Sequence, residues 1–192
     1  MELNSKIDLS PNQKYWEFEY TEYGRVKRVF GKVLPEIPSG RILDLGCSVG
    51  DTTQELSMLY PRLNIIGIDI NPLAVKAAIR EYGNSEKLKF VVADGYKSPF
   101  PDETFDAIFC MNNISFAYKT WEDSDNLRDE FFRNAIQSIG RMVKDEGWLL
   151  ISGEGRAVSQ KFNNKFKNPS STKTFPYGEN RAKKLIELLH QY

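Results

Sequence analysis

Short apolar runs alternate with longer amphipathic runs along most of the chain. The short runs predict five buried strands, over residues 41–45, 64–69, 88–92, 104–111 and 147–151. The longer runs predict helices over residues 52–59, 72–82 and 125–143, the second of them capped by Asn71 and ended by Gly83. Strands separated by helices form a parallel sheet with helices on both faces. The pattern therefore predicts an α/β fold with a doubly wound, mostly parallel sheet.

The two ends of the chain do not follow this alternation of strands and helices. Ser10-Pro11 is typical of a helix start, and an aromatic helix over Tyr15, Trp16, Phe18 and Tyr20 is expected after it. A second helix is predicted from about residue 25 to 34, where prolines stop it. We expect an N-terminal helical cap over residues 1–40 and a main domain over 41–192. Within the main domain, residues 155–174 are polar and predict a loop, and a last helix is expected from about residue 179.

Composition excludes several classes of function. The 192 residues contain 26 Lys and Arg and 26 Asp and Glu, a net charge of zero that argues against a nucleic-acid binder. Cys47 and Cys110 cannot build a disulfide framework, and His190 is the only histidine, so neither a His/Cys zinc site nor a Ser-His-Asp triad is expected. No signal peptide or membrane-spanning run is visible. We expect a cytoplasmic protein without a metal site and without a membrane or nucleic-acid partner.

Acidic residues and glycines follow the first three predicted strands. The first strand leads into Asp44 to Gly50, the second ends at Asp69, and the third ends at Asp94-Gly95. In a sheet of this kind, ligands bind beyond the carboxyl ends of the strands. Each motif also has a purely structural interpretation: a tight strand-to-helix turn, a helix-capping acid, and an Asp-Gly turn, respectively.

The glycine spacing distinguishes between cofactors. Gly46 and Gly50 stand at G-x-x-x-G, whereas a nicotinamide or flavin site uses G-x-G-x-x-G. Asp44, two residues before the first glycine, would repel a pyrophosphate and suits a ligand with a cationic amino-acid end. Asp69 can accept hydrogen bonds from both hydroxyls of a ribose, and Asp94 can accept one from an exocyclic amine such as that of adenine.

Together these motifs resemble the class I S-adenosylmethionine-dependent methyltransferases. The run Ile42 to Gly50 is similar to the family's first motif, Ile68-Asp69-Ile70 to its second and Ala93-Asp94-Gly95 to its third. The stretches 100–108 and 147–151 are similar to those leading into its fourth strand and forming its fifth. The resemblance covers about residues 41–152 and implies a Rossmann-like sheet and S-adenosylmethionine as cofactor.

The resemblance also implies roles for individual residues. Gly46, Cys47 and Ser48 would line the methionine moiety, and Gly50 would open the following helix. Asp69 would hold the ribose, with Ile70 packed on the adenine. Asp94 would accept from the adenine amine, and Gly95 would donate main chain nearby. Asn112 would lie beside the transferable methyl group.

The chain departs from the family pattern at two places. Ser48 stands where the family often has a second glycine. The family usually continues past the last helix with two more strands, whereas this chain stops at Gln191-Tyr192. We therefore expect a sheet whose C-terminal strands are missing, with an open edge at the fifth strand.

Methyl transfer needs alignment more than it needs a catalytic side chain, and the sequence identifies no catalytic residue. Candidates by position are Tyr15, Tyr20, Asn112, Asn113 and Glu154. The run after the fourth strand, Met111 to Ile114, lacks the Asn-Pro-Pro-aromatic pattern of enzymes that methylate nucleic-acid bases, which favours a small-molecule substrate. Alternatives are an aminopropyl-transferring enzyme or a non-catalytic protein with the same pocket; a dehydrogenase is disfavoured. The acceptor atom and the oligomeric state stay open.

Overall fold

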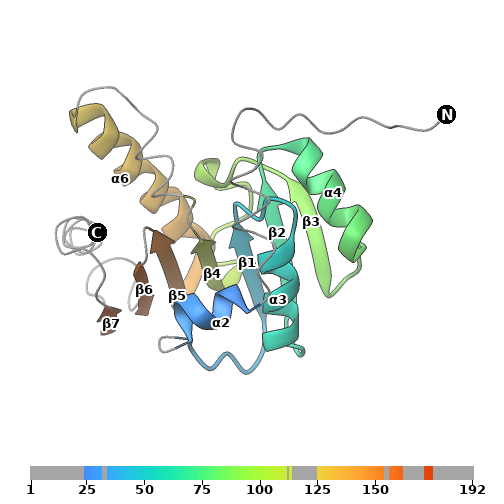
Figure 1. Cartoon of the computed structure of the whole chain (residues 1–192). Coiled ribbons are helices and arrows are strands. Elements are labelled where there is room, and N and C mark those ends of the chain that lie inside the picture. Colours follow the sequence, from blue (N-terminus) through green and yellow to red (C-terminus); the bar gives the residue numbers. More distant parts are fainter. Residues whose placement is uncertain are drawn as a thin grey trace.

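A seven-stranded sheet with the strand order β3-β2-β1-β4-β5-β6-β7 forms the centre of the molecule (Figure 1). The computed structural model describes residues 24–31, 34–111, 113, 125–153, 156–161 and 171–174. Five neighbouring strands pair in parallel: β1 (Arg41–Leu45), β2 (Asn64–Asp69), β3 (Leu88–Val92), β4 (Phe105–Met111) and β5 (Val143–Gly153). The order reverses between β1 and β4, which is the switch point where such sheets bind ligands.

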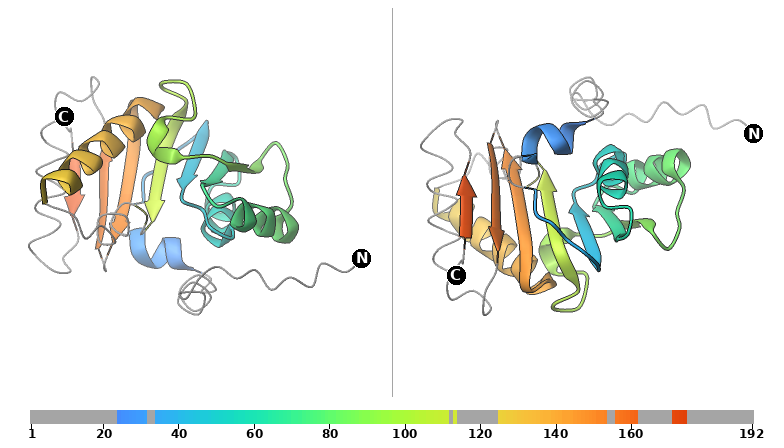
Figure 2. Two further views of the ribbon diagram at one scale, coloured as in Figure 1. Left: turned by 90° about the horizontal axis from the view of Figure 1, so that it is seen from above. Right: turned by 90° about the horizontal axis from the view of Figure 1, so that it is seen from below.

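Helices cover both faces of the sheet, as Figure 2 shows in its two views. They are α2 (Arg25–Phe30), α3 (Asp51–Leu59), α4 (Pro72–Tyr82), the 3₁₀ turn η1 (Gly95–Lys97) and α6 (Asp125–Met142). The α4 helix begins as predicted, because Asn71 accepts a 3.0 Å hydrogen bond from the amide of Leu73, and it ends at Gly83. The predicted α/β class is confirmed.

The core follows from the two-residue period of the strands. On β1, Ile42 packs with Phe30 of α2 and Leu56 of α3, whereas its neighbour Leu43 packs on the opposite face, in the same cluster as Ile139 of α6. β1 is therefore buried on both faces along most of its length, which is why its sequence is mainly apolar.

The α2 helix is held to α3 by the buried carboxylate of Glu55. This carboxylate accepts hydrogen bonds from the backbone amides of Val26 (2.9 Å) and Lys27 (3.1 Å), at the first turn of α2. First-turn amides have no partner within their own helix, so an acceptor supplied by α3 anchors the start of α2. Val26 and Phe30 of α2 also pack in the cluster that contains Ile42 and Leu56.

The expectation of an open edge at β5 is wrong. The predicted loop 155–174 contains β6 (Arg156–Lys161) and β7 (Ser171–Thr174), and β6 pairs antiparallel with β5 from Trp148↔Lys161 to Gly153↔Arg156. β7 in turn pairs antiparallel with β6. Pairing at the edge of a sheet uses backbone groups, so it needs no apolar run, and a polar sequence gives no signal for it.

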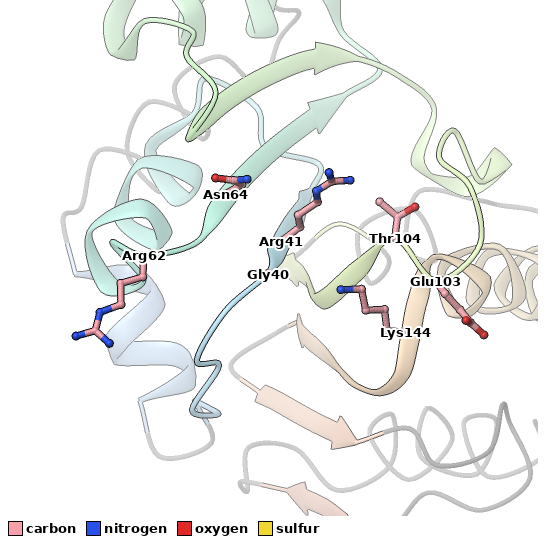
Figure 3. A pocket seen from close by; sticks show the side chains of 7 residues that line it. All are labelled: Gly40, Arg41, Arg62, Asn64, Glu103, Thr104 and Lys144. Carbon is pink, nitrogen blue, oxygen red and sulfur yellow. The ribbon is translucent and has the colours of Figure 1, made fainter.

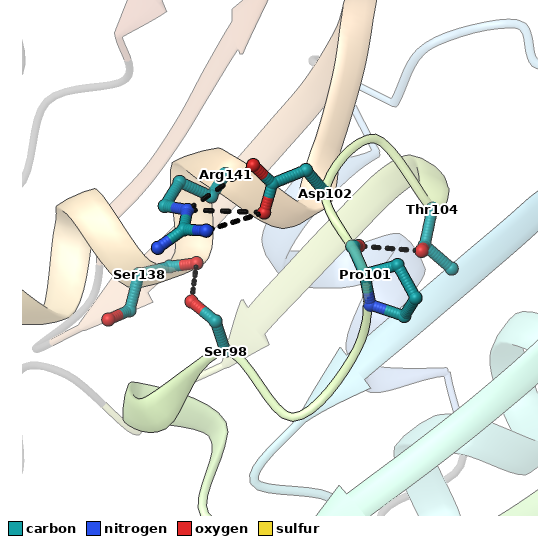
Figure 4. A network of polar contacts seen from close by, with 6 residues as sticks. All are labelled: Ser98, Pro101, Asp102, Thr104, Ser138 and Arg141. Atoms are coloured by element: carbon teal, nitrogen blue, oxygen red, sulfur yellow. Dashed lines mark hydrogen bonds and ion pairs between the residues drawn. The ribbon is translucent and has the colours of Figure 1, made fainter.

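The loop between η1 and β4 is fastened to α6 (Figure 4). The hydroxyl of Ser98 donates a 2.8 Å hydrogen bond to the carbonyl of Ser138, and Arg141 pairs with the exposed carboxylate of Asp102 at 3.1 Å. Thr104 closes the turn by donating to the carbonyl of Pro101 at 2.7 Å. These contacts hold the segment that leads from the end of β3 to the start of β4.

Several expectations concern residues outside those that the structure describes. They are the aromatic helix over 15–20, the last helix from 179, and the candidate residues Tyr15, Tyr20, Asn112 and Glu154. Within the described part, no helix combines the length and apolar character that crossing a bilayer requires.

Candidate functional site

The loops that follow β1 and β2 are tied together at the carboxyl edge of the sheet. The carboxylate of Asp69 accepts a 3.0 Å hydrogen bond from the backbone amide of Ser48 and a 2.8 Å bond from that of Asn71. Two amides of the first loop, those of Gly46 and Cys47, donate to the carbonyl of Ile68 at 2.8 and 2.9 Å. Since each carboxylate oxygen has two acceptor positions, Asp69 retains acceptor capacity for a ligand while it braces the loop.

The carboxyl group of Asp44 lies beneath this loop and is almost fully buried, with 1% of the residue exposed. The hydroxyl of Thr53, in the first turn of α3, donates a 2.6 Å hydrogen bond to it. Burial raises the pKa of Asp44 to about 7; the Thr53 bond opposes the shift, Asp69 adds to it and Arg25 opposes it. Asp44 is thus a buried acid whose ionised form would be stabilised by a cation placed beside it.

The backbone of the loop explains its residue types. Gly46, Ser48 and Gly50 all have positive φ angles, of 81°, 48° and 96°. Glycine adopts this left-handed conformation without strain, and Ser48 adopts it with a side chain. Ser48, the departure from the family pattern, thus adopts the left-handed conformation that glycine adopts most readily. Gly50 leads into α3 and supplies no side-chain cap to it.

Cys47 is a structural residue of the loop. It is 3% exposed, and it packs with Val75 and Ala78 of α4 and with Phe90 of β3. Burial and the nearby Asp44 and Asp69 carboxylates raise the pKa of its thiol. The thiol therefore stays protonated and lines the loop without serving as a nucleophile.

Asp94 and Gly95 follow the third strand, and Ile70 follows the second. Asp94 caps η1 by accepting from the amide of Tyr96 at 3.1 Å, and its other oxygen lies 3.2 Å from the exposed ammonium of Lys97. Gly95 packs against Leu45 at the end of β1, with no room for a side chain: a Cβ there would lie 2.8 Å from the Leu45 Cγ. Ile70, after β2, is 69% exposed and presents an apolar side chain to solvent.

The sequence analysis did not identify Thr53, Arg25 or Tyr96 at this edge of the sheet. It named Asn113 only because that residue follows the fourth strand. Thr53 and Arg25 act on Asp44, and Tyr96 donates a hydrogen bond from its hydroxyl to Oδ1 of Asn113, the residue proposed by position alone. The Asn113 side chain lies against Gly46, where a Cβ would collide with its amide nitrogen. Linear spacing carries no signal for these contacts, because each joins segments that only the fold brings together.

A separate hollow of about 510 Å³ lies at the opposite, amino edge of the sheet (Figure 3). Asp106 braces this edge, accepting from the Arg41 amide at 2.8 Å and from the Lys144 ammonium at 2.9 Å. The residues that line the hollow are Gly40, Arg41, Arg62, Asn64, Glu103, Thr104 and Lys144. None of these is a predicted site residue, so the acidic residues and the glycine loop all belong to the carboxyl edge.

The carboxyl edge thus presents three acids at the ends of three adjacent strands, with a glycine-containing loop between the first two. The three carboxyl acceptors fit a ligand with an ammonium group for Asp44, a diol for Asp69 and an amine for Asp94. S-adenosylmethionine has all three groups. Within the described residues, no group of three His, Cys, Asp or Glu residues is arranged to hold a metal ion.

Comparison with known proteins agrees with this arrangement. A malonyl-[acyl-carrier protein] O-methyltransferase of Legionella pneumophila is 35% identical over 143 residues, which cover 71% of this chain and 46% of that protein. A demethylmenaquinone methyltransferase of Thermotoga maritima is 29% identical over 125 residues, covering 65% of this chain and 48% of that protein. The chain thus spans about half the length of these curated relatives.

The fold itself has counterparts among solved structures. Phosphoethanolamine N-methyltransferase 2 of Haemonchus contortus, in complex with S-adenosyl-L-methionine, matches with a TM-score of 0.54 and 18% identity. The match covers 67% of this chain and 27% of that one, and it concerns the fold alone. Residues 42–147, more than half of the chain, match a family described as "Methyltransferase domain". The chain therefore belongs to this methyltransferase-domain family.

Proposed function

We propose that the protein is an S-adenosylmethionine-dependent methyltransferase that acts on a small molecule by in-line methyl transfer. The observation that carries the proposal is the position of Asp69, at the end of β2, with its carboxylate tied to the loop after β1 through the Ser48 amide. This contact sets an acceptor for ribose hydroxyls beside the loop that would line the rest of the cofactor.

The predicted site residues have the following proposed roles. Asp44 pairs with the ammonium group of the cofactor, and Gly46, Cys47 and Ser48 line its methionine moiety, while Gly50 opens α3. Asp69 holds the ribose, exposed Ile70 covers the adenine, and Asp94 with Gly95 recognises the adenine amine. Asn112 stays the predicted neighbour of the transferable methyl group.

The chemistry requires little beyond positioning. S-adenosylmethionine supplies a methyl group on a sulfonium centre, which is a good leaving group. The residues of the chain hold this group in line with the acceptor, and such alignment contributes on the order of 7–11 kcal/mol. A general base is needed only where the acceptor arrives protonated, and we assign that role to no residue.

The proposed substrate class rests on composition and on the relatives. Their names refer to malonyl-[acyl-carrier protein] and to demethylmenaquinone, and neither refers to nucleic acid. A net charge of zero supports the same exclusion. A cytoplasmic location is part of the proposal, supported by Cys47 and Cys110, both buried as free thiols. The division into a cap over 1–40 and a main domain over 41–192 also stays a proposal.

Thermal unfolding with and without S-adenosylmethionine, or its demethylated product, tests the proposal. At a hundred times its dissociation constant, a ligand stabilises the folded state by about 2.7 kcal/mol. For a chain of this size, we expect a rise in melting temperature of roughly 5–11 °C. Asp69→Ala should abolish the rise, whereas Asp102→Ala, which removes an exposed acid away from the site, should preserve it. A folded protein whose melting temperature neither ligand changes would contradict the proposal.

A further inference from the structure

Three residues that are distant in the sequence meet beside the loop after β1. Tyr96 lies in η1, Asn113 follows β4, and Gly46 follows β1. The Tyr96 hydroxyl donates to Oδ1 of Asn113. The amide nitrogen of Asn113 then lies against Gly46, as the first atom that a Cβ at this glycine would meet. The amide therefore has a defined orientation, with its oxygen toward the phenol and its N–H groups toward the loop.

The segment that carries Tyr96 is held on both sides. Asp94 accepts from the Tyr96 amide at 3.1 Å, and close packing on Leu45 leaves no room for a side chain at Gly95. Two residues after Tyr96, the Ser98 hydroxyl is bonded to the Ser138 carbonyl of α6 at 2.8 Å (Figure 4). The phenol thus projects from a braced turn, which fixes where its hydroxyl can reach.

The phenol keeps its proton under all ordinary conditions. Burial raises the pKa of Tyr96, and the nearby Cys110, Asp94 and Asp69 raise it further. A phenol hydroxyl can donate or accept, and here it donates to the amide oxygen of Asn113. Both amide N–H groups remain as donors on the side of Gly46.

We propose that Tyr96 is a positioning residue that holds the Asn113 amide over Gly46, where its N–H groups face the amino-acid end of the cofactor. The inference rests on the proposed function and extends it. Asp44 precedes Gly46 by two residues and provides a carboxyl acceptor, and Asn113 provides neutral donors. An amino-acid end carries an ammonium and a carboxylate, so an acid and an amide donor complement its two charges.

Isothermal titration calorimetry with two probes tests the inference. S-adenosylhomocysteine contains the adenosine and the amino-acid end, and 5′-methylthioadenosine lacks the amino-acid end. Tyr96→Phe keeps the ring and removes only the hydroxyl. We expect it to weaken S-adenosylhomocysteine binding by about 3- to 10-fold, the effect of one hydrogen bond. Binding of 5′-methylthioadenosine should change by less than about 2-fold, because its contacts do not include Asn113.

Two further variants complete the design. Asn113→Ala should weaken S-adenosylhomocysteine selectively as well, and Tyr96→Phe should then add no further loss, because the residue acts through Asn113. Tyr60→Phe is the matched control: this hydroxyl donates to the Pro35 carbonyl at 3.0 Å, away from the carboxyl edge. It should leave both affinities unchanged.

These outcomes distinguish failure of the proposed function from failure of the positioning role of Tyr96. Failure of the wild-type protein to bind either probe would refute the proposed function itself. Binding of both probes by the wild type, with Tyr96→Phe weakening them equally or neither of them, would overturn the positioning role alone. A selective loss that persists undiminished in the Asn113→Ala background would also overturn it, since Tyr96 would then act on the ligand directly.

Discussion

Thr53 donates a 2.6 Å hydrogen bond to the carboxyl group of Asp44, joining the first turn of α3 to the end of β1. The contact is possible because Gly67, on the neighbouring strand β2, has no side chain. A Cβ at Gly67 would lie 2.6 Å from the Thr53 hydroxyl oxygen and 2.9 Å from the Cys47 Cβ. The hydrogen bond from Thr53 to the buried Asp44 therefore depends on Gly67, a glycine in another strand.

Gly67→Ala is accordingly expected to displace Thr53 from Asp44. Crowding in a packed interior costs about 1–3 kcal/mol of stability, and the lost hydrogen bond would raise the pKa of Asp44 further, since Thr53 lowers it. Urea unfolding measures the change in stability. In a Thr53→Ala background the same substitution should cost clearly less, because the atom that it crowds is gone. Equal costs in both backgrounds would show that Thr53 is not the point of conflict.

The raised pKa of Asp44 predicts a pH dependence of stability. The folded protein holds a proton on Asp44 up to a pH of about 7, whereas the ordinary value is 3.8. Between these values the folded state binds more protons than the unfolded chain, so this group's contribution is fully present below about pH 4 and is lost as pH rises to about 7. Asp44→Asn keeps a neutral acceptor for Thr53, so its stability relative to wild type should rise across that window.

Unfolding free energies of both proteins between about pH 4 and pH 8 measure this difference. Asp102→Asn, which changes an exposed acid, is the matched control and should give a curve parallel to wild type. A constant difference between Asp44→Asn and wild type across the range would mean that Asp44 is ionised in the folded protein throughout.

Ser48 predicts how the loop tolerates substitution. Its φ angle of 48° is left-handed, a conformation that costs non-glycine residues about 1–2 kcal/mol. Ser48→Gly relieves this strain but adds freedom to the unfolded chain, so stability should stay within about 1 kcal/mol of wild type. Ser48→Val, with a branched Cβ, should be destabilised by at least about 1–2 kcal/mol. Both variants keep the backbone amide that donates to Asp69. The urea midpoints of the two variants and the wild type compare their stabilities. A Ser48→Val variant as stable as wild type would show that the left-handed conformation carries no strain.

Glu55 should control the attachment of α2. Glu55→Ala removes the acceptor of two first-turn amides, those of Val26 and Lys27, and the expected loss is about 2–3 kcal/mol. Hydrogen exchange at these two amides should accelerate more than at the amides of β1. Gln54→Ala, at the neighbouring and half-buried position of α3, is the control that should leave their exchange slow. Unchanged protection in Glu55→Ala would mean that α2 is held by its apolar side chains alone.

The elements that were predicted well are those whose signal is local. Asn71 and Gly83 mark the two ends of α4 by side-chain capping and backbone freedom, and both boundaries agree with the structure. β2 was predicted residue for residue, from Asn64 to Asp69, because a strand buried on both faces is an unbroken apolar run. β5 begins at Val143 and not at Gly147, since it follows α6 directly after Met142. Its pairing with β4 shifts register between Val143 and Trp148, so the regular part of the strand is the part that was predicted.

The sequence by itself determined the α/β class and the positions of Asp44, Asp69 and Asp94 at strand ends, because periodicity and the chemistry of short motifs are properties of neighbouring residues. Tertiary structure alone decided that Thr53 bonds to Asp44 and that Tyr96 orients Asn113. It also decided that β6 covers the edge of β5. Each of these depends on backbone geometry that brings distant segments within hydrogen-bond range, and no spacing along the chain encodes that distance.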